Sequence, residues 1–188
     1  MPFRLLTQGL ACGNAHGQTK DTMQHTALKL ATETPDDWWE IEALDEVCFE
    51  PGRSALESYR LREGVDPVAR LCLTARDDAG ILAGAVRNWP VRVGGQEAVL
   101  LGPIAVHPTR QGEGVATLLM QRCLNDARDI GWARLMLVGD APYYQRFGFS
   151  QLQDVMMPPP TNPDRVLGVS LVDGAWGGVR GDVTVARD

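Results

Sequence analysis

The segment Gln111–Ala116 contains the residues whose types and spacing point most directly to chemistry. It reads Gln-Gly-Glu-Gly-Val-Ala and joins an apolar, strand-like run at residues 99–106 to an amphipathic run that continues to Ile130. Glycines at a strand-to-helix turn let the backbone approach a ligand closely, and the first N–H groups of a helix have no internal partner. These donors and the positive end of the helix dipole together form an anion site. The segment therefore predicts a site that binds phosphate.

Two common phosphate-binding motifs do not fit this segment. A P-loop requires Gly-Lys-Ser/Thr at its end, and no such sequence follows Gly112 and Gly114. A dinucleotide-binding fingerprint would need its third glycine at Thr117. The phosphate is therefore expected to belong to another class of ligand.

Length and composition are typical of one globular domain. The chain has 188 residues, of which 44% are hydrophobic and 22% charged, with a formal net charge of -6. This acidity argues against a nucleic-acid partner, whose phosphates require clustered Lys and Arg, and it suits a cationic partner such as an amine. No apolar run approaches the ~20 residues that span a bilayer, so no membrane partner is expected.

The chain is expected to consist of a short extension and one domain. Residues 1–25 show no sustained hydrophobic period and are expected to be disordered, with the domain at residues 26–188. The cysteines are irregularly spaced, without a CxxC pair or a histidine cluster, so no metal site is predicted. Cys48 and Cys123 fall on the apolar faces of expected helices, which favours reduced thiols and a cytoplasmic location.

Hydrophobic periodicity predicts the elements that position the turn. Strands are expected at residues 27–32, 68–75, 81–89, 98–106, 135–138 and 166–172, and helices at 34–48, 54–62, 114–130 and 142–146. Short turns between the second, third and fourth strands predict an antiparallel meander. The run Leu135–Val138 is apolar throughout, so we expect a central strand that a right-handed crossover places parallel to residues 98–106. Gly102-Pro103 inside that strand indicates a bulge or a split.

Two motifs stand out in this arrangement. The first is Gln111-x-x-Gly114-x-Ala116, which follows a strand ending in Val106-His107-Pro108, and the second is Tyr143-Tyr144-Gln145-Arg146-Phe147-Gly148-Phe149. Together they resemble the motifs of the GNAT superfamily of acyl-CoA-dependent N-acetyltransferases. The resemblance covers roughly residues 28–152. It implies an α/β fold of the α+β type, with a mixed, mostly antiparallel twisted sheet of about six to seven strands. Helices would flank this sheet, and its central parallel pair of strands would splay apart.

The resemblance also implies acetyl-CoA as co-substrate, without a metal. The coenzyme diphosphate would lie at the turn, and its extended pantetheine arm would pair with the open edge of the parted strand. The implied coenzyme-binding residues are Ile104, Ala105, Val106, Gln111, Gly112, Glu113, Gly114, Val115, Ala116, Thr117 and Tyr144.

Tyr144 occupies the position of the family's general-acid tyrosine. A phenol with a pKa of about 10 stays protonated at neutral pH and can donate a proton to a departing thiolate. The alternative role for Tyr144 is packing on the pantetheine arm. The catalytic base stays open between Asp140, just past the central strand, and Glu50, at the end of the first long helix. A chain of water molecules could also remove the proton, and His107 is expected beside the phosphate turn.

The sequence departs from the family pattern at two places. Glu113 stands where many relatives have a basic residue, and Arg110 is expected to compensate in part. The turn from Val138 to Tyr144 is short and lacks the asparagine that many relatives place before this helix.

The implied activity is direct transfer of an acetyl group to a primary amine of a small molecule or peptide, within a ternary complex. The protein would act as a monomer or a homodimer. The alternative function is a non-catalytic acyl-CoA sensor or interaction module with the same fold.

Overall fold

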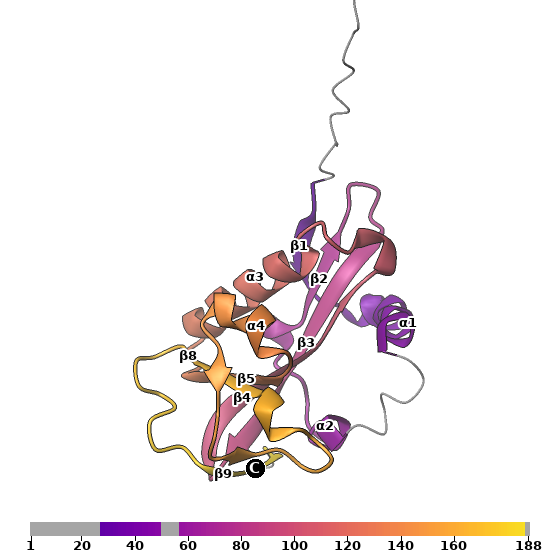
Figure 1. The fold of residues 1–188 in the computed structure, drawn as a ribbon. Coiled ribbons are helices and arrows are strands. Elements are labelled where there is room, and N and C mark those ends of the chain that lie inside the picture. Colours follow the sequence, from indigo (N-terminus) through magenta and orange to yellow (C-terminus); the bar gives the residue numbers. More distant parts are fainter. Residues whose placement is uncertain (1–26, 50–56, 187–188) are drawn as a thin grey trace, which may run out of the picture.

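The computed structural model describes residues 27–49 and 57–186, which form a twisted sheet with helices packed on it (Figure 1). The strands are β1 (Lys29–Thr32), β2 (Leu73–Arg76), β3 (Leu82–Val93), β4 (Gln96–Val106), β5 (Arg134–Val138), β6 (Ser150–Gln151), β7 (Val155–Met156), β8 (Val166–Ser170) and β9 (Gly181–Val185). The helices are α1 (Trp38–Phe49), α2 (Glu57–Arg60), α3 (Val115–Asp129) and α4 (Ala141–Tyr144). The extension expected at residues 1–25 and the candidate base Glu50 lie outside the described residues.

The strands confirm a mixed and mostly antiparallel sheet. Within the described residues their order is β1-β2-β3-β4-β5-β8-β6, and each neighbouring pair on this path is antiparallel except β4 and β5. The parallel pair β4 and β5 lies inside the sheet, as the crossover rule predicts. Strand β9 pairs with the far end of β3 at Val91–Val93, and β7 pairs in parallel with β9. The main path matches the expected strand number, and β7 and β9 are additions to it.

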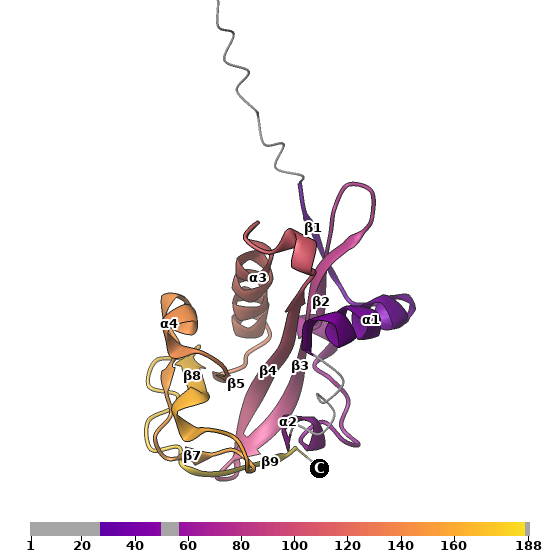
Figure 2. The same ribbon diagram turned by 45° about the vertical axis from the view of Figure 1, so that its right-hand side comes forward.

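Helices α1 and α3 lie on opposite faces of the sheet (Figure 2). Leu119, Cys123 and Ala127 of α3 are buried in the cluster that covers β2 to β5. Ile41 and Leu44 of α1 pack against β3 and β4 on the other face. These residues are spaced three or four apart, so they lie on one side of each helix. The helices predicted from this spacing are therefore present.

The parallel pair β4 and β5 separates soon after it forms. Its paired positions are Val99 with Leu135 and Leu100 with Met136. On its other edge, β4 pairs with β3 as far as Val106, with a register shift where Gly102 and Pro103 stand opposite Arg87. Two residues opposite one make a bulge, which bends the strand that carries the extra residue. The predicted irregularity at Gly102-Pro103 is therefore present and adjoins the point of separation.

The segment before β3 and several later strands differ from the sequence-based expectation. Residues 68–75 were expected to be one strand, but Ala69–Leu71 forms a 3-10 turn and β2 begins at Leu73. The carbonyl of Leu71 accepts a hydrogen bond from the side chain of buried Asn88, over 2.7 Å, which replaces a partner strand. An apolar run alone does not distinguish a strand from such a buried turn. Strands β6, β7 and β9 were not expected, since β6 and β7 have only two residues each and the alternation of Val183 and Val185 in β9 is short.

Arg87 links β3 to the segment that follows β1 and to helix α1. Its guanidinium donates to both carboxylate oxygens of Glu33, with Nε at 3.0 and 2.9 Å, and its Nη1 donates to Glu42 of α1 at 2.7 Å. Only 9% of the Arg87 side chain is exposed. The ion pairs therefore fix α1 against the bulged part of the sheet.

We expect Arg87→Gln to lower the free energy of unfolding by about 3 kcal/mol, because it leaves two partly buried carboxylates without their cation. The matched control is Arg165→Gln, which removes an ion pair with Asp140 whose two side chains are 50% and 75% exposed. That control should cost about 0.5 kcal/mol. Urea unfolding of both variants measures the difference, and equal losses would show that Arg87 does not anchor α1.

Candidate active site

The turn between β4 and α3 presents main-chain donors at the start of the helix. Gly114 precedes α3 with a φ of 82°, which glycine adopts without strain. The first helical hydrogen bond runs from the N–H of Leu118 to the carbonyl of Gly114, over 3.0 Å. The N–H groups of Val115, Ala116 and Thr117 precede this bond, and none of them donates to another group in the described part of the chain.

A cavity of about 360 Å³ opens in front of these donors. The turn residues line one side of it, and Tyr143 and Arg146 line another. Glu113 is the one residue of the predicted turn that does not line this cavity. Its carboxylate instead accepts a hydrogen bond from Nε of Arg110, over 2.8 Å. Arg110 also donates to Asp77 at 3.1 Å, so its charge is shared between two carboxylates.

The open edge of β4 leads from this cavity toward the middle of the sheet. The N–H of His107 donates to the carbonyl of Ala83 at 2.9 Å, so these residues form a hydrogen-bonded pair of the antiparallel ladder. The alternation of the ladder then turns the peptide groups of Ala105 toward β3, and those of Ile104 and Val106 toward the gap. Of the three predicted strand residues, Ala105 therefore has its main-chain groups within the sheet, and its side chain is buried.

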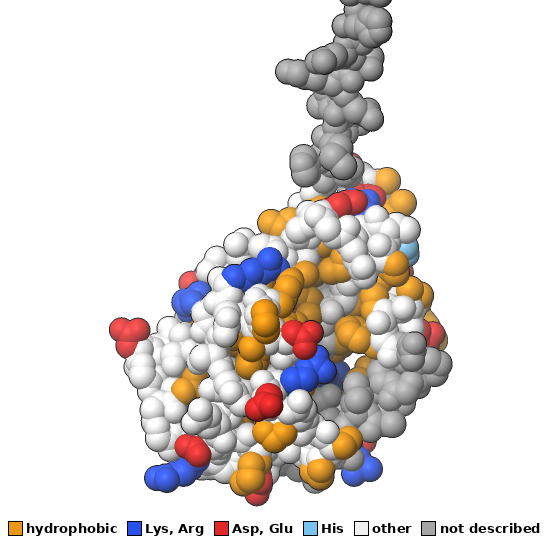
Figure 3. All heavy atoms as spheres, viewed as in Figure 1, with side chains coloured by type: hydrophobic (Ala, Val, Ile, Leu, Met, Phe, Trp, Pro, Cys, Tyr) orange, Lys and Arg blue, Asp and Glu red, His pale blue; other side chains and the backbone are white. Residues whose placement is uncertain are grey.

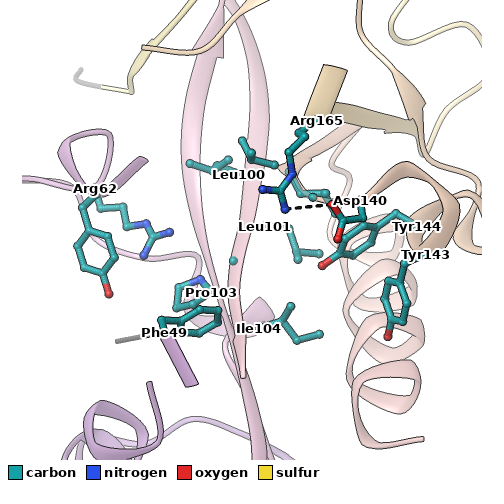
Figure 4. Close-up of a pocket in the computed structure, with 15 residues that line it drawn as sticks. Phe49, Arg62, Leu100, Leu101, Pro103, Ile104, Asp140, Tyr143, Tyr144 and Arg165 are labelled. Atoms are coloured by element: carbon teal, nitrogen blue, oxygen red, sulfur yellow. Dashed lines mark ion pairs between the residues drawn. The ribbon is translucent and has the colours of Figure 1, made fainter. Parts of the chain in front are cut away.

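A cleft of about 390 Å³ occupies the gap between β4 and β5 (Figure 4). Its walls are Leu100–Ile104 of β4 on one side, and Leu137–Asp140 with Tyr143 and Tyr144 on the other. Apolar side chains gather around the hollow on this face, with acidic and basic groups near its rim (Figure 3). The cleft is therefore lined by apolar side chains together with the charged groups of Arg62, Asp140 and Arg165.

Tyr144 lies on the wall of this cleft, on the short helix α4. Its ring packs edge-on against Tyr143 and Phe149, with centroid separations of 4.9 and 5.9 Å. Burial raises the pKa of the Tyr144 phenol above its usual value, with smaller effects from Tyr143 and Asp140. A raised pKa keeps the proton on the phenol, so this side chain remains a proton donor at neutral and mildly alkaline pH.

The predicted candidates for a base lie in different environments. Asp140 is at the rim of the cleft, where it is 75% exposed and pairs with Arg165 over 3.3 Å. Glu50 lies outside the described residues. The Nδ1 atom of His107 lies 2.8 Å from the Thr109 hydroxyl and accepts the Thr109 N–H at 3.3 Å, so this ring caps the turn before α3. Asp140 is therefore the one of these three groups that the described residues place at the cleft.

Several residues of the cleft had no signal in the sequence. Phe49, Tyr59 and Arg62 reach it from α1 and from the segment at α2, and Arg165 reaches it from the turn before β8. The guanidinium of Arg62 lies over the rings of Tyr59 and Trp89, at 4.4 and 4.5 Å from their centroids. These residues belong to no recognisable spacing, because long-range packing alone brings them together. The described residues include no cluster of three or more metal-ligating side chains.

Gly139 allows the ring of Tyr144 to lie against the end of β5. A Cβ at this position would be 2.8 Å from Cδ2 of Tyr144 and 3.0 Å from Cδ1 of Leu137, which is closer than such atoms pack. The Tyr144 ring therefore fits against the short turn after Val138 because residue 139 has no side chain.

We expect Gly139→Ala to displace the Tyr144 ring and to cost about 1–3 kcal/mol of stability, the usual range for overpacking. A double-mutant cycle tests this contact, because in a Tyr144→Ala background the added methyl group no longer meets the ring. The cost of Gly139→Ala should then fall by at least about 1 kcal/mol. Strictly additive losses in urea unfolding would contradict the proposed packing.

Comparison with known proteins agrees with this geometry. Residues 37–149 match the acetyltransferase (GNAT) family model. The chain is 35% identical over 124 residues to YhbS, an uncharacterised N-acetyltransferase of Escherichia coli K12, and the match covers 65% of this chain and 73% of YhbS. Among the described residues, no helix combines the length and apolar character needed to cross a membrane.

Solved structures show the same fold. The crystal structure of E. coli YhbS in complex with CoA superposes with a TM-score of 0.75 at 31% identity, over 85% of this chain and 90% of that one. A GNAT family acetyltransferase from Brucella melitensis in complex with acetyl-CoA has a TM-score of 0.62 at 27% identity, over 85% of this chain and 96% of that one. With more than half of the chain matched by the family model and a parted β4–β5 pair at its centre, the chain belongs to the GNAT acetyltransferase family.

Proposed function

We propose that this protein transfers an acetyl group from acetyl-CoA to a primary amine of a small molecule or peptide. The observation that carries the proposal is a continuous path along the open edge of β4. The path starts at the unpaired donors of α3, follows the outward peptide groups of Val106 and Ile104, and ends in the cleft beside Tyr144. Two relatives above 25% identity hold CoA or acetyl-CoA in their crystal structures, which supports the same coenzyme here.

The coenzyme fits this path in one direction. Its diphosphate would accept hydrogen bonds from the N–H groups at residues 112–117, where the dipole of α3 adds positive potential. Its pantetheine amides would pair with the main chain of Ile104 and Val106, as an added strand pairs with a sheet edge. The thioester would then lie in the cleft between β4 and the end of β5.

The acceptor would approach from the side of α1 and α2. A second cavity of about 260 Å³ shares Tyr59, Arg62 and Pro103 with the cleft, so it adjoins the expected position of the thioester. Three acidic residues, Glu42, Asp45 and Glu63, line it together with Arg62 and Arg87, so the cavity is polar and suits a polar acceptor. The proposed acceptor class, a primary amine, rests on the similarity to N-acetyltransferases.

The chemical step is a direct attack without a covalent enzyme intermediate. The neutral amine nitrogen bonds to the thioester carbonyl carbon, and the carbonyl oxygen becomes an oxyanion that a main-chain N–H group at the cleft would stabilise. The carbon–sulfur bond then breaks, and the departing thiolate takes the phenolic proton of Tyr144. The amine loses a proton to Asp140, to Glu50 or to a chain of water molecules, and this proton restores the phenol.

The same fold without catalysis would be an acyl-CoA sensor. Release of free thiol from acetyl-CoA distinguishes the two functions when the protein is tested with polyamines, aminoglycosides, amino acids and N-terminal peptides. Acetyl-CoA-dependent thiol release with one of these amines supports the enzyme. Tight binding of acetyl-CoA without thiol release from any of them would favour the sensor.

We expect Tyr144→Phe to lower kcat by about ten- to a thousandfold while the Kd of acetyl-CoA stays within about threefold, because only the proton donor is lost. Tyr143→Phe is the matched control, since Tyr143 is the neighbouring phenol on the same cleft and should keep most of the activity. Steady-state kinetics and calorimetric titration measure the two quantities. An unchanged kcat in Tyr144→Phe would assign Tyr144 a packing role.

Acetyl-CoA should slow amide exchange at residues 112–117, because their N–H groups would gain phosphate oxygens as acceptors. Hydrogen exchange followed by NMR or mass spectrometry at increasing coenzyme concentration measures this protection. Amides at the distant C-terminal end of α3, near Asp129, provide the internal reference. Protection that is equal at both ends of the helix, or absent at the turn, would contradict the proposed diphosphate site.

A further inference from the structure

We propose that Arg146 is the side-chain cation that binds a phosphate group of the coenzyme. The inference rests on the proposed function, and it adds a binding residue that lies outside the glycine turn. Arg146 belongs to the 3-10 turn Gln145–Phe147, which directly follows α4. It lines the cavity in front of the α3 donors.

The donors of the turn supply only partial charges, whereas a coenzyme phosphate carries full negative charges. Two arginines, Arg110 and Arg146, line this cavity within the described residues. A guanidinium binds phosphate most strongly when its N–H groups are free to form charge-assisted hydrogen bonds. The surroundings of each arginine therefore decide which of them is available.

Arg110 is occupied by the protein itself. Its Nε donates to Glu113 at 2.8 Å, and its Nη1 donates to Asp77 at 3.1 Å. Its third nitrogen, Nη2, is shielded from solvent and has no hydrogen-bond partner among the described residues. One cation shared by two carboxylates has no positive charge left for a phosphate. Arg110 therefore stabilises the turn rather than replacing the basic residue that stands at position 113 in many relatives.

Arg146 has the opposite surroundings. Its guanidinium carbon lies 4.0 Å from the ring centroid of Tyr143 and 4.8 Å from that of Phe147, so the rings hold the flat face of the group. Its Nη2 donates to the hydroxyl of Thr117 at 3.4 Å, which places it beside the N–H donors of α3. No carboxylate in the described residues pairs with it. Stacking leaves the edge N–H groups of an arginine available for a phosphate.

This arrangement also links the two ends of the coenzyme site. Arg146 follows Tyr144 by two residues, and Tyr143 lines both the cleft and the phosphate cavity. A phosphate held by Arg146 would therefore fasten α4 and its following turn against α3. The same phosphate contact that binds the coenzyme would keep the phenol near the thioester.

The test compares Arg146→Gln with ligands that do and do not carry phosphate. Calorimetry gives the Kd of acetyl-CoA, and NMR titration gives that of S-acetylpantetheine, which contains the thioester arm without any phosphate. We expect the Kd of acetyl-CoA to rise about ten- to a hundredfold, the loss expected for a charged hydrogen-bonded contact. The Kd of S-acetylpantetheine should change less than about twofold, and Arg146→Lys should restore part of the acetyl-CoA affinity.

A matched control removes one positive charge from the opposite end of α3. Arg128→Gln changes an exposed arginine near the far end of α3, where the guanidinium donates to the Leu124 carbonyl and to the Asn125 side chain. This control should leave both Kd values unchanged. Dephospho-CoA separates the two phosphate sources: equal weakening of CoA and dephospho-CoA in Arg146→Gln assigns the contact to the diphosphate. Loss confined to CoA assigns it to the 3′-phosphate.

Two results would overturn the inference. An acetyl-CoA Kd within twofold of wild type in Arg146→Gln would show that Arg146 binds no phosphate. Equal weakening of acetyl-CoA and S-acetylpantetheine would show that Arg146 acts only by packing against Tyr143 and Phe147. Failure of the wild-type protein to bind either ligand is a different outcome, because it removes the proposed function together with this residue's role.

Discussion

Leu100 of β4 and Met136 of β5 form the last paired position between these parallel strands, and the site depends on their separation beyond it. A pair that stayed together would use the peptide groups of both strands and leave no cleft. The bulge at Gly102–Pro103 bends β4 at this point, while β3 holds its other edge in register as far as Val106. One edge of a rigid strand is thereby left open. Because the chain continues directly into the turn, the donors of α3 stand at the end of that edge.

Along the open edge of β4, the arginines that form ion pairs within the protein differ from the arginine proposed to bind the coenzyme. Glu33 and Glu42 hold Arg87 on the face of α1, and this group fixes the helix against the bulged strands. Arg110 is held in the same way at the turn by its two carboxylates. Among the described residues, Arg146 contacts two aromatic rings and the hydroxyl of Thr117, and no carboxylate pairs with it. The turn before α3 thus supplies main-chain N–H dipoles, and Arg146 supplies a full positive charge from the 3-10 turn that follows α4.

The position of Tyr144 illustrates how a local departure from a family pattern can be accommodated. The turn after β5 is short, so α4 begins close to the end of the strand. The Tyr144 ring fits there because Gly139 has no side chain, and burial of the ring raises the pKa of the phenol. The same short turn places Asp140 at the exposed rim of the cleft, beside Arg165. One compact segment therefore sets the environment of both polar groups.

Sequence alone predicted the features that depend on neighbouring residues. The glycine turn before α3, the period of its buried face and the irregularity at Gly102–Pro103 follow from backbone geometry and from local side-chain spacing. Residues 68–75 show the limit, because a hydrogen bond from Asn88 converts half of an apparent strand into a turn. Tertiary structure alone decided which arginine is neutralised and which distant residues wall the cleft. These features arise from pairing between segments far apart in the chain, and no local pattern encodes such contacts.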